Sequence, residues 1–440
     1  MSELLERILS RDNMSNAYKR VYANKGSSGV DGVTVDELLE YARQNWKSIK
    51  EQIRHRKYKP LPVKRVEIPK PNGGVRKLGI PTVMDRVIQQ AIVQVLSPMC
   101  EPLFSEFSYG FRPNRSCRTA IEQLLVYLNE GYEWIVDIDL EKFFDNVPQD
   151  KLMSLVHNIV NDGDTESLIR KYLKAGVMTD RGFEETLIGT PQGGNLSPLL
   201  SNIMLNELDK ELEARGLRFT RYADDCVIAV KSQASAKRVM RTVSDWIQRK
   251  LGLKVNMEKT HITRPRNLKY LGFGFWKDNK AKEWKCRPHQ DSVKKFQNKL
   301  KLLTVRNIPG TVKEKCTKLG MVIRGWINYY AIGSMKTVMA QTDEHLRTRL
   351  RVLIWKQWKV PSKRRNALIK LGIDKDLASV TAYCGDRYYW IATKTCLKYA
   401  VNKVNLAARG LVSCYDYYME QHAKIKAKRL FDQQHHVMLR

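Results

Sequence analysis

Two apolar, strand-like stretches with aspartates at their ends constrain the fold of this chain more than any other feature. The first is WIVDIDL at 134–140, and the second is LRFTRYADDCVIAV at 217–230. Strand interiors normally avoid Asp, so Asp224 and Asp225 indicate a turn between two strands. Asp137 and Asp139 share one face of the first strand because side chains alternate with a period of two. A strand-end aspartate beside a hairpin-tip aspartate predicts a compact carboxylate cluster.

The rest of the chain indicates several kinds of structure. From about 134 to 275 strands and helices alternate, which predicts an α+β fold with a mostly antiparallel sheet. Upstream, VKRVEIPKPNGGVRKLGIPT predicts a hairpin with a basic tip. Apolar residues at helical spacing predict one helix around Val87–Leu96 and another from about 234 to 251, ended by Gly252. After about 285 the segments are basic, aromatic-bearing helices.

Charge and cysteine content narrow the class of protein. The 440 residues include 77 Lys and Arg against 46 Asp and Glu, a net charge of +31. A polyanion is the natural partner of such a chain, and the absence of an apolar run of membrane-spanning length favours nucleic acid over a membrane. Eight scattered cysteines without a C-x-x-C motif predict neither a zinc site nor a disulfide framework, and fit a reducing cytosol.

The predicted carboxylate cluster has a specific chemistry. Carboxylate oxygens are hard ligands that suit Mg²⁺. Two such ions about 3.5–4 Å apart activate a hydroxyl and stabilise a leaving pyrophosphate during phosphoryl transfer. A pair of adjacent aspartates alone is also typical of an ordinary turn, so the cluster depends on the strand that ends near Asp139.

A set of motifs resembles the reverse transcriptase family, and their order along the chain matches it. They are DLEKFFD at 139–145, GTPQGGNLSPLLSN at 189–202, YADD at 222–225, LGLKVNMEKT at 251–260 and YLGFGF at 270–275. GFRP at 110–113 and RGWINYY at 324–330 are similar to group II intron-encoded reverse transcriptases, the latter to their maturase region. The resemblance covers nearly the whole chain and weakens after about 370.

The resemblance implies that Asp139, Asp224 and Asp225 are the catalytic, metal-binding triad. The cofactor would be two Mg²⁺ ions, which Mn²⁺ can replace. Asp137 is the alternative ligand on the same strand, and the spacing to the following FFD favours Asp139.

The same resemblance implies roles around the triad. Either Phe143 or Phe144 would be the gate that excludes a 2′-hydroxyl, and the spacing favours Phe144; the alternative is two core phenylalanines. The other nucleotide-binding candidates are Lys70, Arg76, Arg65, Gln192 and Lys259, the last as a proton donor to pyrophosphate. The candidates for contact with primer or template are Tyr222, Gly193, Gly194, Gly272 and Gly274. The alternative is that the charged residues are ordinary surface cations and that the glycines lie in ordinary turns.

The basic C-terminal helices supply candidates for RNA binding, since cations bind phosphates while most of the neighbouring aromatics are expected in the core. The candidates are Arg324, Arg347, Arg349, Arg351, Lys363, Arg364 and Arg365.

The resemblance implies a right-hand polymerase with a helical thumb. The predicted domains are an N-terminal extension (1–35), fingers and palm (36–276), a thumb or maturase domain (285–370) and a basic helical DNA-binding domain (371–440). The protein would be a bacterial cytoplasmic RNA-directed DNA polymerase of the compact class C type, without an HNH endonuclease domain. It would bind its parent group II intron RNA, assist splicing, and copy the intron into cDNA at a target DNA during retrohoming.

Two alternatives stay open at this point. One is a catalytically silent maturase, against which the intact Asp139, Asp224 and Asp225 argue. The other is a reverse transcriptase of a retron or a diversity-generating element, against which RGWINYY argues.

Overall fold

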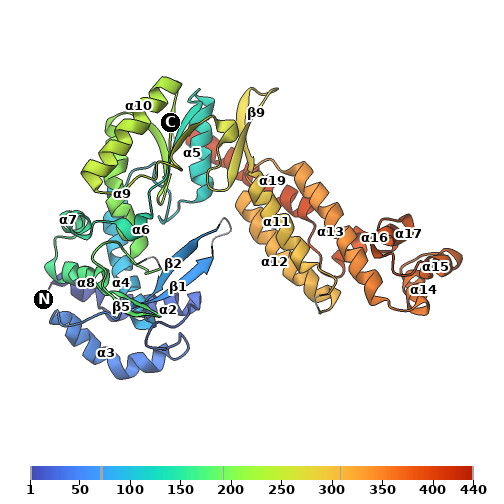
Figure 1. Cartoon of the computed structure of the whole chain (residues 1–440), viewed down its shortest axis with the longest axis horizontal. Helices are drawn as coiled ribbons and strands as arrows, with labels where there is room; N and C mark the ends of the chain where they lie inside the picture. Colours follow the sequence, from blue (N-terminus) through green and yellow to red (C-terminus); the bar gives the residue numbers. More distant parts are fainter. Residues whose placement is uncertain (1, 70–72, 192, 308, 439–440) are drawn as a thin grey trace. The chain divides into compact units, whose positions relative to one another are not determined.

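The computed structural model describes residues 2–69, 73–191, 193–307 and 309–438, with side chains described up to 428. The chain divides into two compact units, Met1–Arg264 and Pro265–Arg440. The first unit mixes helices with sheets and the second is mainly helical (Figure 1), so the expected α+β class is confirmed. Within the described residues no helix is both long and apolar enough to cross a membrane.

The elements of the first unit begin with three helices and a hairpin, and end with the strands of the central sheet. In order they are α1 (Glu3–Ile8), α2 (Arg11–Asn24), α3 (Leu38–Arg54), β1 (Val63–Pro69), β2 (Val75–Ile80), α4 (Val83–Cys100), α5 (Cys117–Asn129), β3 (Trp134–Ile138), α6 (Phe143–Asn146), α7 (Gln149–Val160), α8 (Gly163–Leu173), β4 (Val177–Thr179), β5 (Gly182–Glu184), α9 (Ser197–Ala214), β6 (Arg218–Tyr222), β7 (Asp225–Val230), α10 (Gln233–Trp246) and β8 (His261–Thr263).

The central sheet has the strand order β6-β7-β3-β8, and every pair in it is antiparallel. On one face Val136, Ile138 and Ile228 belong to the hydrophobic core. Because side chains alternate, Asp137 lies on the opposite face. Helices α5, α9 and α10 pack against these strands. The mostly antiparallel sheet expected from the sequence is therefore confirmed.

Helix α4 is the buried centre of the N-terminal half of this unit. Nearly all of its residues from Val83 to Leu96 are buried, as in a helix that contacts protein on all sides. Its first turn contains the buried Asp85, whose carboxylate accepts hydrogen bonds from Tyr58 Oη at 2.6 Å and Thr82 Oγ1 at 2.7 Å. Burial raises the pKa of Asp85. The helix predicted around Val87–Leu96 is confirmed, and it is longer at both ends.

Two other predicted elements are present. Strands β1 and β2 form the expected antiparallel hairpin, within a second sheet of order β2-β1-β4-β5. The helix expected from about 234 to 251 is α10, continued by a π-helical turn at Ile247–Leu251. It ends at Gly252, whose φ of 69° is in the left-handed region that glycine adopts at low cost.

The second unit consists of a hairpin followed by helices. Its elements are β9 (Phe273–Asp278), β10 (Glu283–Pro288), α11 (Gln290–Leu303), α12 (Val312–Tyr330), α13 (Lys336–Gln357), α14 (Pro361–Lys370), α15 (Lys375–Ala382), α16 (Tyr388–Ala392), α17 (Thr395–Ala400), α18 (Lys403–Ala407) and α19 (Cys414–Met438). Aromatic side chains hold these helices together. Phe296 of α11 stacks on Trp326 of α12 at 4.3 Å between ring centroids, and the fully buried Trp355 of α13 donates to the carbonyl of Gly385 at 3.0 Å.

Candidate active site

A tight hairpin between β6 and β7 presents Asp224 and Asp225. Tyr222 pairs with Asp225, which leaves Ala223 and Asp224 as the two turn residues. Ala223 has a φ of 57°, in the left-handed region that two-residue hairpin turns require. Asp224 therefore lies at the tip, and Asp225 begins the next strand.

Asp139 follows the end of β3 and lies beside the start of β7. Ile138 pairs with Cys226, so continuing the register places Asp139 level with Asp225. The segment 251–260 fixes its backbone: Asp139 N donates to Thr260 Oγ1 at 3.1 Å, and Asp139 O accepts from the N–H of Asn256 at 2.8 Å. The structure thus brings together two motifs that lie more than a hundred residues apart in the chain.

Lys259 comes from the same segment and faces the carboxylate. Its Nζ lies 3.7 Å from Asp139 Oδ1, with both side chains accessible to solvent. The predicted proton donor is therefore next to the predicted metal ligand.

The carboxylates repel one another. Burial, and then the negative charges of Asp224, Asp137 and Asp139, raise the pKa of Asp225 to about 7. Burial is also the main reason that the pKa of Asp137 is raised to about 6. The pKa of Asp224 is raised by burial and by the charge of Asp139, while Arg76 acts in the opposite direction. Such a cluster favours a bound cation.

The donor set fits a divalent cation completed by substrate. Among the described residues, no group of three or more His, Cys, Asp or Glu side chains is arranged to hold a metal ion by itself. Mg²⁺ typically needs no such cage in nucleotide enzymes, because it binds one or two carboxylates together with substrate phosphates and water. Asp139, Asp224 and Asp225 provide hard oxygen donors of this kind.

Residues 189–191 pack against helix α6, which contains the predicted sugar gate. Thr190 N donates to Phe144 O at 2.7 Å. A Cβ at Gly189 would lie only 2.7 Å from the same carbonyl, so glycine allows this close approach. Phe143 is buried, whereas Phe144 is partly exposed and meets it edge-on at 5.2 Å. Of the two rings, Phe144 has a surface available to a nucleotide.

The next glycines along the chain approach the N-terminal part of the unit. A Cβ at Gly193, where φ is 127°, would lie 2.5 Å from Gly79 O of strand β2. A Cβ at Gly194 would lie 2.8 Å from Gln89 Oε1 of α4. Gln192 lies outside the described residues.

The cations of the β1–β2 hairpin are not equivalent. The register places Arg65 and Arg76 on opposite faces of the hairpin. The charge of Arg76 reaches Asp224, since it lowers the pKa of that carboxyl. Arg76 is therefore close enough for its charge to act on Asp224, whereas Arg65 lies on the other face of the hairpin. Lys70 lies outside the described residues.

Tyr222 links the β6–β7 turn to helix α5. Its pKa is raised to about 12, first by burial and then by a hydrogen bond with Cys117, the first residue of α5. Its predicted contact with primer or template stays a prediction.

In the second unit, YLGFGF and RGWINYY pack on each other. Gly272, with φ of 80°, allows Tyr330 Oη to approach, because a Cβ there would lie 2.4 Å from that oxygen. Tyr329 Oη donates to Leu271 O at 2.9 Å. A Cβ at Gly274 would meet His289 at 3.5 Å, an ordinary contact, so only Gly272 is required to be glycine on these grounds. Primer contact by either glycine stays a prediction.

The predicted RNA-binding cations differ in exposure. Arg324, Lys363 and Arg365 are exposed, while Arg347 and Arg349 are partly buried. Arg349 also donates to Thr304 Oγ1 at 2.6 Å.

Two of the RNA-binding candidates require correction. Arg351 and Arg364 are each only 4% exposed. Arg351 Nε donates to Val401 O at 3.1 Å, and Arg364 Nε donates to Trp358 O at 2.8 Å. Their guanidinium groups hold the helices of this unit together, so these two residues are not available as surface contacts for RNA.

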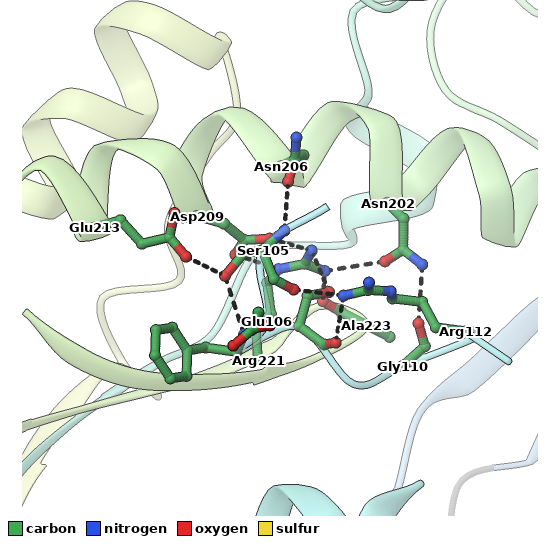
Figure 2. Close-up of polar contacts among 12 residues, drawn as sticks. Ser105, Glu106, Gly110, Arg112, Asn202, Asn206, Asp209, Glu213, Arg221 and Ala223 are labelled. Atoms are coloured by element: carbon green, nitrogen blue, oxygen red, sulfur yellow. Dashed lines mark hydrogen bonds and ion pairs between the residues drawn. The ribbon is translucent and has the colours of Figure 1, made fainter. Parts of the chain in front are cut away.

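A buried arginine behind the β6–β7 turn was not predicted from the sequence. Arg221, the residue before Tyr222, is fully buried and pairs with the equally buried Asp209 of α9 (Figure 2). A signal was present, because a charged residue within a buried strand needs a partner. Arg112 of GFRP is likewise buried and paired, with Glu101 at 2.8 Å.

Comparison with known proteins shows which families the chain is similar to. Residues 68–275 match the family model described as reverse transcriptase (RNA-dependent DNA polymerase), and residues 293–371 match the group II intron, maturase-specific domain. Protein YkfC of Escherichia coli (strain K12) is 33% identical over 60% of this chain and 79% of its own length. Group II intron-encoded protein LtrA of Lactococcus lactis subsp. cremoris is 38% identical over 50% of this chain and 37% of its own length. Among solved structures, the "Partial Cas6-RT-Cas1--Cas2 complex" is 25% identical over 59% of this chain and 44% of that chain, with a TM-score of 0.37.

An antiparallel sheet with carboxylates clustered beside a hairpin turn is the arrangement expected of a polymerase-type nucleotidyl transferase. The chain belongs to the reverse transcriptase family, the RNA-directed DNA polymerases, and carries a group II intron maturase-specific domain. It spans well under half the length of LtrA.

The repulsion among the carboxylates predicts a pH-dependent effect of Asp225→Asn. A raised carboxyl pKa means that the folded state binds the proton more tightly than the unfolded state, so stability falls as pH rises from 3.8 to about 7. Asparagine escapes this loss. In EDTA at pH 8 we expect the variant to melt above the wild type, by less than the full pKa shift would imply, because the Asp225 side chain is exposed to solvent.

Thermal unfolding at pH 5 and pH 8 checks this expectation. At pH 5 the difference between variant and wild type should be much smaller. Asp245→Asn, at an exposed position on α10, is the control and should show no such pH dependence. An equal difference at both pH values would contradict the expectation.

Proposed function

We propose that this reverse transcriptase binds the group II intron RNA that encodes it, assists the splicing of that RNA, and copies it into cDNA during retrohoming. The observation that carries the proposal is the presence in one chain of a reverse transcriptase region at 68–275 and a maturase-specific region at 293–371. The printed name of LtrA, a group II intron-encoded protein, supports it. A bacterial cytoplasmic location is supported by the cysteines, none of which forms a disulfide in the described structure.

The domains follow from this proposal. Residues 1–35 would be the N-terminal extension, 36–276 the fingers and palm, 285–370 the thumb or maturase domain, and 371–440 a basic domain for target DNA. The boundary between the two compact units, after Arg264, falls near the end of the proposed palm.

The proposed mechanism assigns a role to each group of the site. Two Mg²⁺ ions, which Mn²⁺ can replace, would activate the primer 3′-hydroxyl and neutralise the leaving pyrophosphate. Asp139 and Asp224 would hold them, with Asp225 at the base of the turn. Lys259 would donate a proton to the pyrophosphate, and Arg76 would hold the triphosphate. Phe144 would fill the space of a 2′-hydroxyl.

Exposed aromatic side chains in the last part of the second unit support the DNA-binding role. Tyr383, Tyr389, Trp390 and Tyr399 are all exposed, and Lys394 Nζ lies 4.5 Å from the centroid of the Trp390 ring. Exposed aromatic rings stack on unpaired bases, and neighbouring cations bind the phosphates. These exposed rings would therefore stack on the bases of a single-stranded part of the target DNA.

Removal of one metal ligand tests the polymerase assignment. Asp139→Asn and Asp224→Asn should each abolish DNA synthesis while RNA affinity stays nearly unchanged, because metal ligation and phosphate binding use different surfaces. Primer extension on an RNA template measures the first property, and filter binding of intron RNA the second. Substantial synthesis by both variants would overturn the site.

The gate assignment predicts a change in sugar selection. Phe144→Ala should raise ribonucleotide incorporation relative to deoxynucleotides, because the ring no longer excludes the 2′-hydroxyl. Phe143→Ala is the matched control, since that ring is buried in the core. Competition between ribonucleotides and deoxynucleotides in single-nucleotide extension measures the ratio. If only the Phe143 variant relaxes selection, the gate is the other ring.

The exposed cations predict a change in salt dependence. Each phosphate neutralised on a single strand contributes about −0.7 to the slope of log K against log salt. The triple variant Arg324→Glu, Lys363→Glu and Arg365→Glu should flatten the slope for intron RNA. Equal charge reversal at the exposed Lys237, Arg238 and Arg241 of α10 is the control. Equal slopes in the two triple variants would place the RNA elsewhere.

A further inference from the structure

Behind the catalytic turn lies a buried polar network centred on Arg221. Arg221 and Asp209 are each 0% exposed, and their side chains pair twice, Nε to Oδ1 at 2.7 Å and Nη2 to Oδ2 at 2.5 Å. Arg221 Nη2 also donates to Ser108 Oγ at 2.8 Å. A buried ion pair costs desolvation energy and often stabilises a fold less than apolar residues of equal volume would. Stability alone therefore does not explain why this ion pair lies beside an active site.

One contact of Arg221 reaches the turn itself. Its Nη1 donates to the carbonyl oxygen of Ala223 at 2.9 Å (Figure 2). That carbonyl belongs to the peptide that joins Ala223 to Asp224, so the hydrogen bond fixes the plane from which the Asp224 side chain departs. Ala223 is in the left-handed region, which is unfavourable for a residue with a Cβ and persists only where the surroundings enforce it.

A second residue connects this arginine to the loop that covers the turn. Asn202 Oδ1 accepts from Arg221 Nη1 at 3.1 Å, and Asn202 Nδ2 donates to Gly110 O at 2.9 Å. Gly110 lies so close to the turn that a Cβ there would be 2.2 Å from Ala223 N. The turn is thus in contact with both a guanidinium, at the Ala223 carbonyl, and a glycine backbone, at the Ala223 nitrogen.

The partners of the network come from one face of α9. Asn202, Asn206, Asp209 and Glu213 are spaced by four, three and four residues, which places them on one side of a helix. Asn206 Oδ1 accepts from the N–H of Ser105 at 3.2 Å, and Glu213 Oε1 from Ser105 Oγ at 2.5 Å. This polar stripe ties α9 to both the loop and Arg221.

We infer that Arg221, oriented by Asp209 and Asn202, is a positioning residue that sets the direction of the Asp224 carboxylate in the nucleotidyl-transfer site. It does not touch substrate; it acts through the Ala223–Asp224 peptide. The planar guanidinium is needed because it bonds Asp209 in a fork and still has a donor for Ala223 O. An ammonium at this place cannot do both.

Arg221→Lys tests the inference, because it keeps a positive charge beside Asp209 and removes the fork. We expect kcat for primer extension to fall about 10²-fold, the cost of an error of about 1 Å in a reacting group. At saturating Mg²⁺ the KM for deoxynucleotide and the affinity for primer and template should stay unchanged, while half-saturation with Mg²⁺ should require more metal. Asn202→Ala should change the same quantities in the same direction by less.

A control variant and a Mg²⁺ titration separate a positioning role from a contribution to stability. Phe219→Leu alters a fully buried apolar side chain two residues before Arg221; it should lower Tm and leave the Mg²⁺ requirement unchanged. Mg²⁺ itself, titrated in thermal unfolding without nucleotide, should raise the Tm of the wild type and of Phe219→Leu more than that of Arg221→Lys.

The outcomes distinguish this inference from the family activity on which it rests. An inactive wild type would overturn the polymerase assignment, while the Mg²⁺ titration would still report on Arg221. An active wild type with Arg221→Lys of equal kcat and equal Mg²⁺ requirement would show that the ion pair only stabilises the fold. If Arg221→Lys does not fold, Asn202→Ala decides between the same two results.

Discussion

The structure has to hold together carboxylates that repel one another. Asp139 and Asp225 are brought level by the pairing of β3 with β7, and Asp224 is presented by the turn beside them. Their pKa values show the cost, since burial and mutual charge raise that of Asp225 to about 7. Without the sheet register, and without groups that fix the turn from outside, these side chains would separate.

The groups that fix the positions of these aspartates are not themselves members of the carboxylate cluster. The backbone of Asp139 is held by neutral donors and acceptors from 251–260. The turn is held by Arg221, whose charge is balanced by Asp209 within the same buried pair. A balanced pair supplies geometry while leaving the carboxylates available to a cation. Glycines at 110 and 189 supply the remaining close approaches, where a Cβ would collide with backbone.

Local patterns in the sequence predicted much of this arrangement. Alternation and turn residues were enough for the β1–β2 hairpin, the β6–β7 hairpin and helix α10, because each is decided by neighbours in the chain. The aspartates at the strand end and at the hairpin tip predicted one carboxylate cluster, and the resemblance implied that Asp139, Asp224 and Asp225 form its catalytic triad. The register that places Asp139 level with Asp225 is a long-range pairing, and no local pattern specifies it.

Burial of charged side chains was the part that sequence did not predict. Arg364 lies between Lys363 and Arg365 in one basic stretch, and Arg351 lies in another. Helix packing nevertheless turns Arg351 and Arg364 inward and leaves Lys363 and Arg365 exposed. Arg221 differs because its partners, Asp209 on α9 and Ser108 in a distant loop, meet only in the folded chain. The polar stripe of α9 was the readable signal, since polar residues at helical spacing on a buried helix require polar partners.

Because of the charge distribution, metal binding and nucleotide binding at the site depend on each other. A chain with a net charge of +31 attracts nucleic acid and nucleotides, but at the centre the phosphates meet carboxylates of the same sign. Only Arg76 and Lys259 among the predicted and described site residues place positive charge near them. The carboxylates are too few to enclose an ion alone, and the triphosphate is repelled if it arrives alone. Each therefore completes the site for the other, and because such coupling is reciprocal, metal should raise nucleotide affinity by the same factor as nucleotide raises metal affinity.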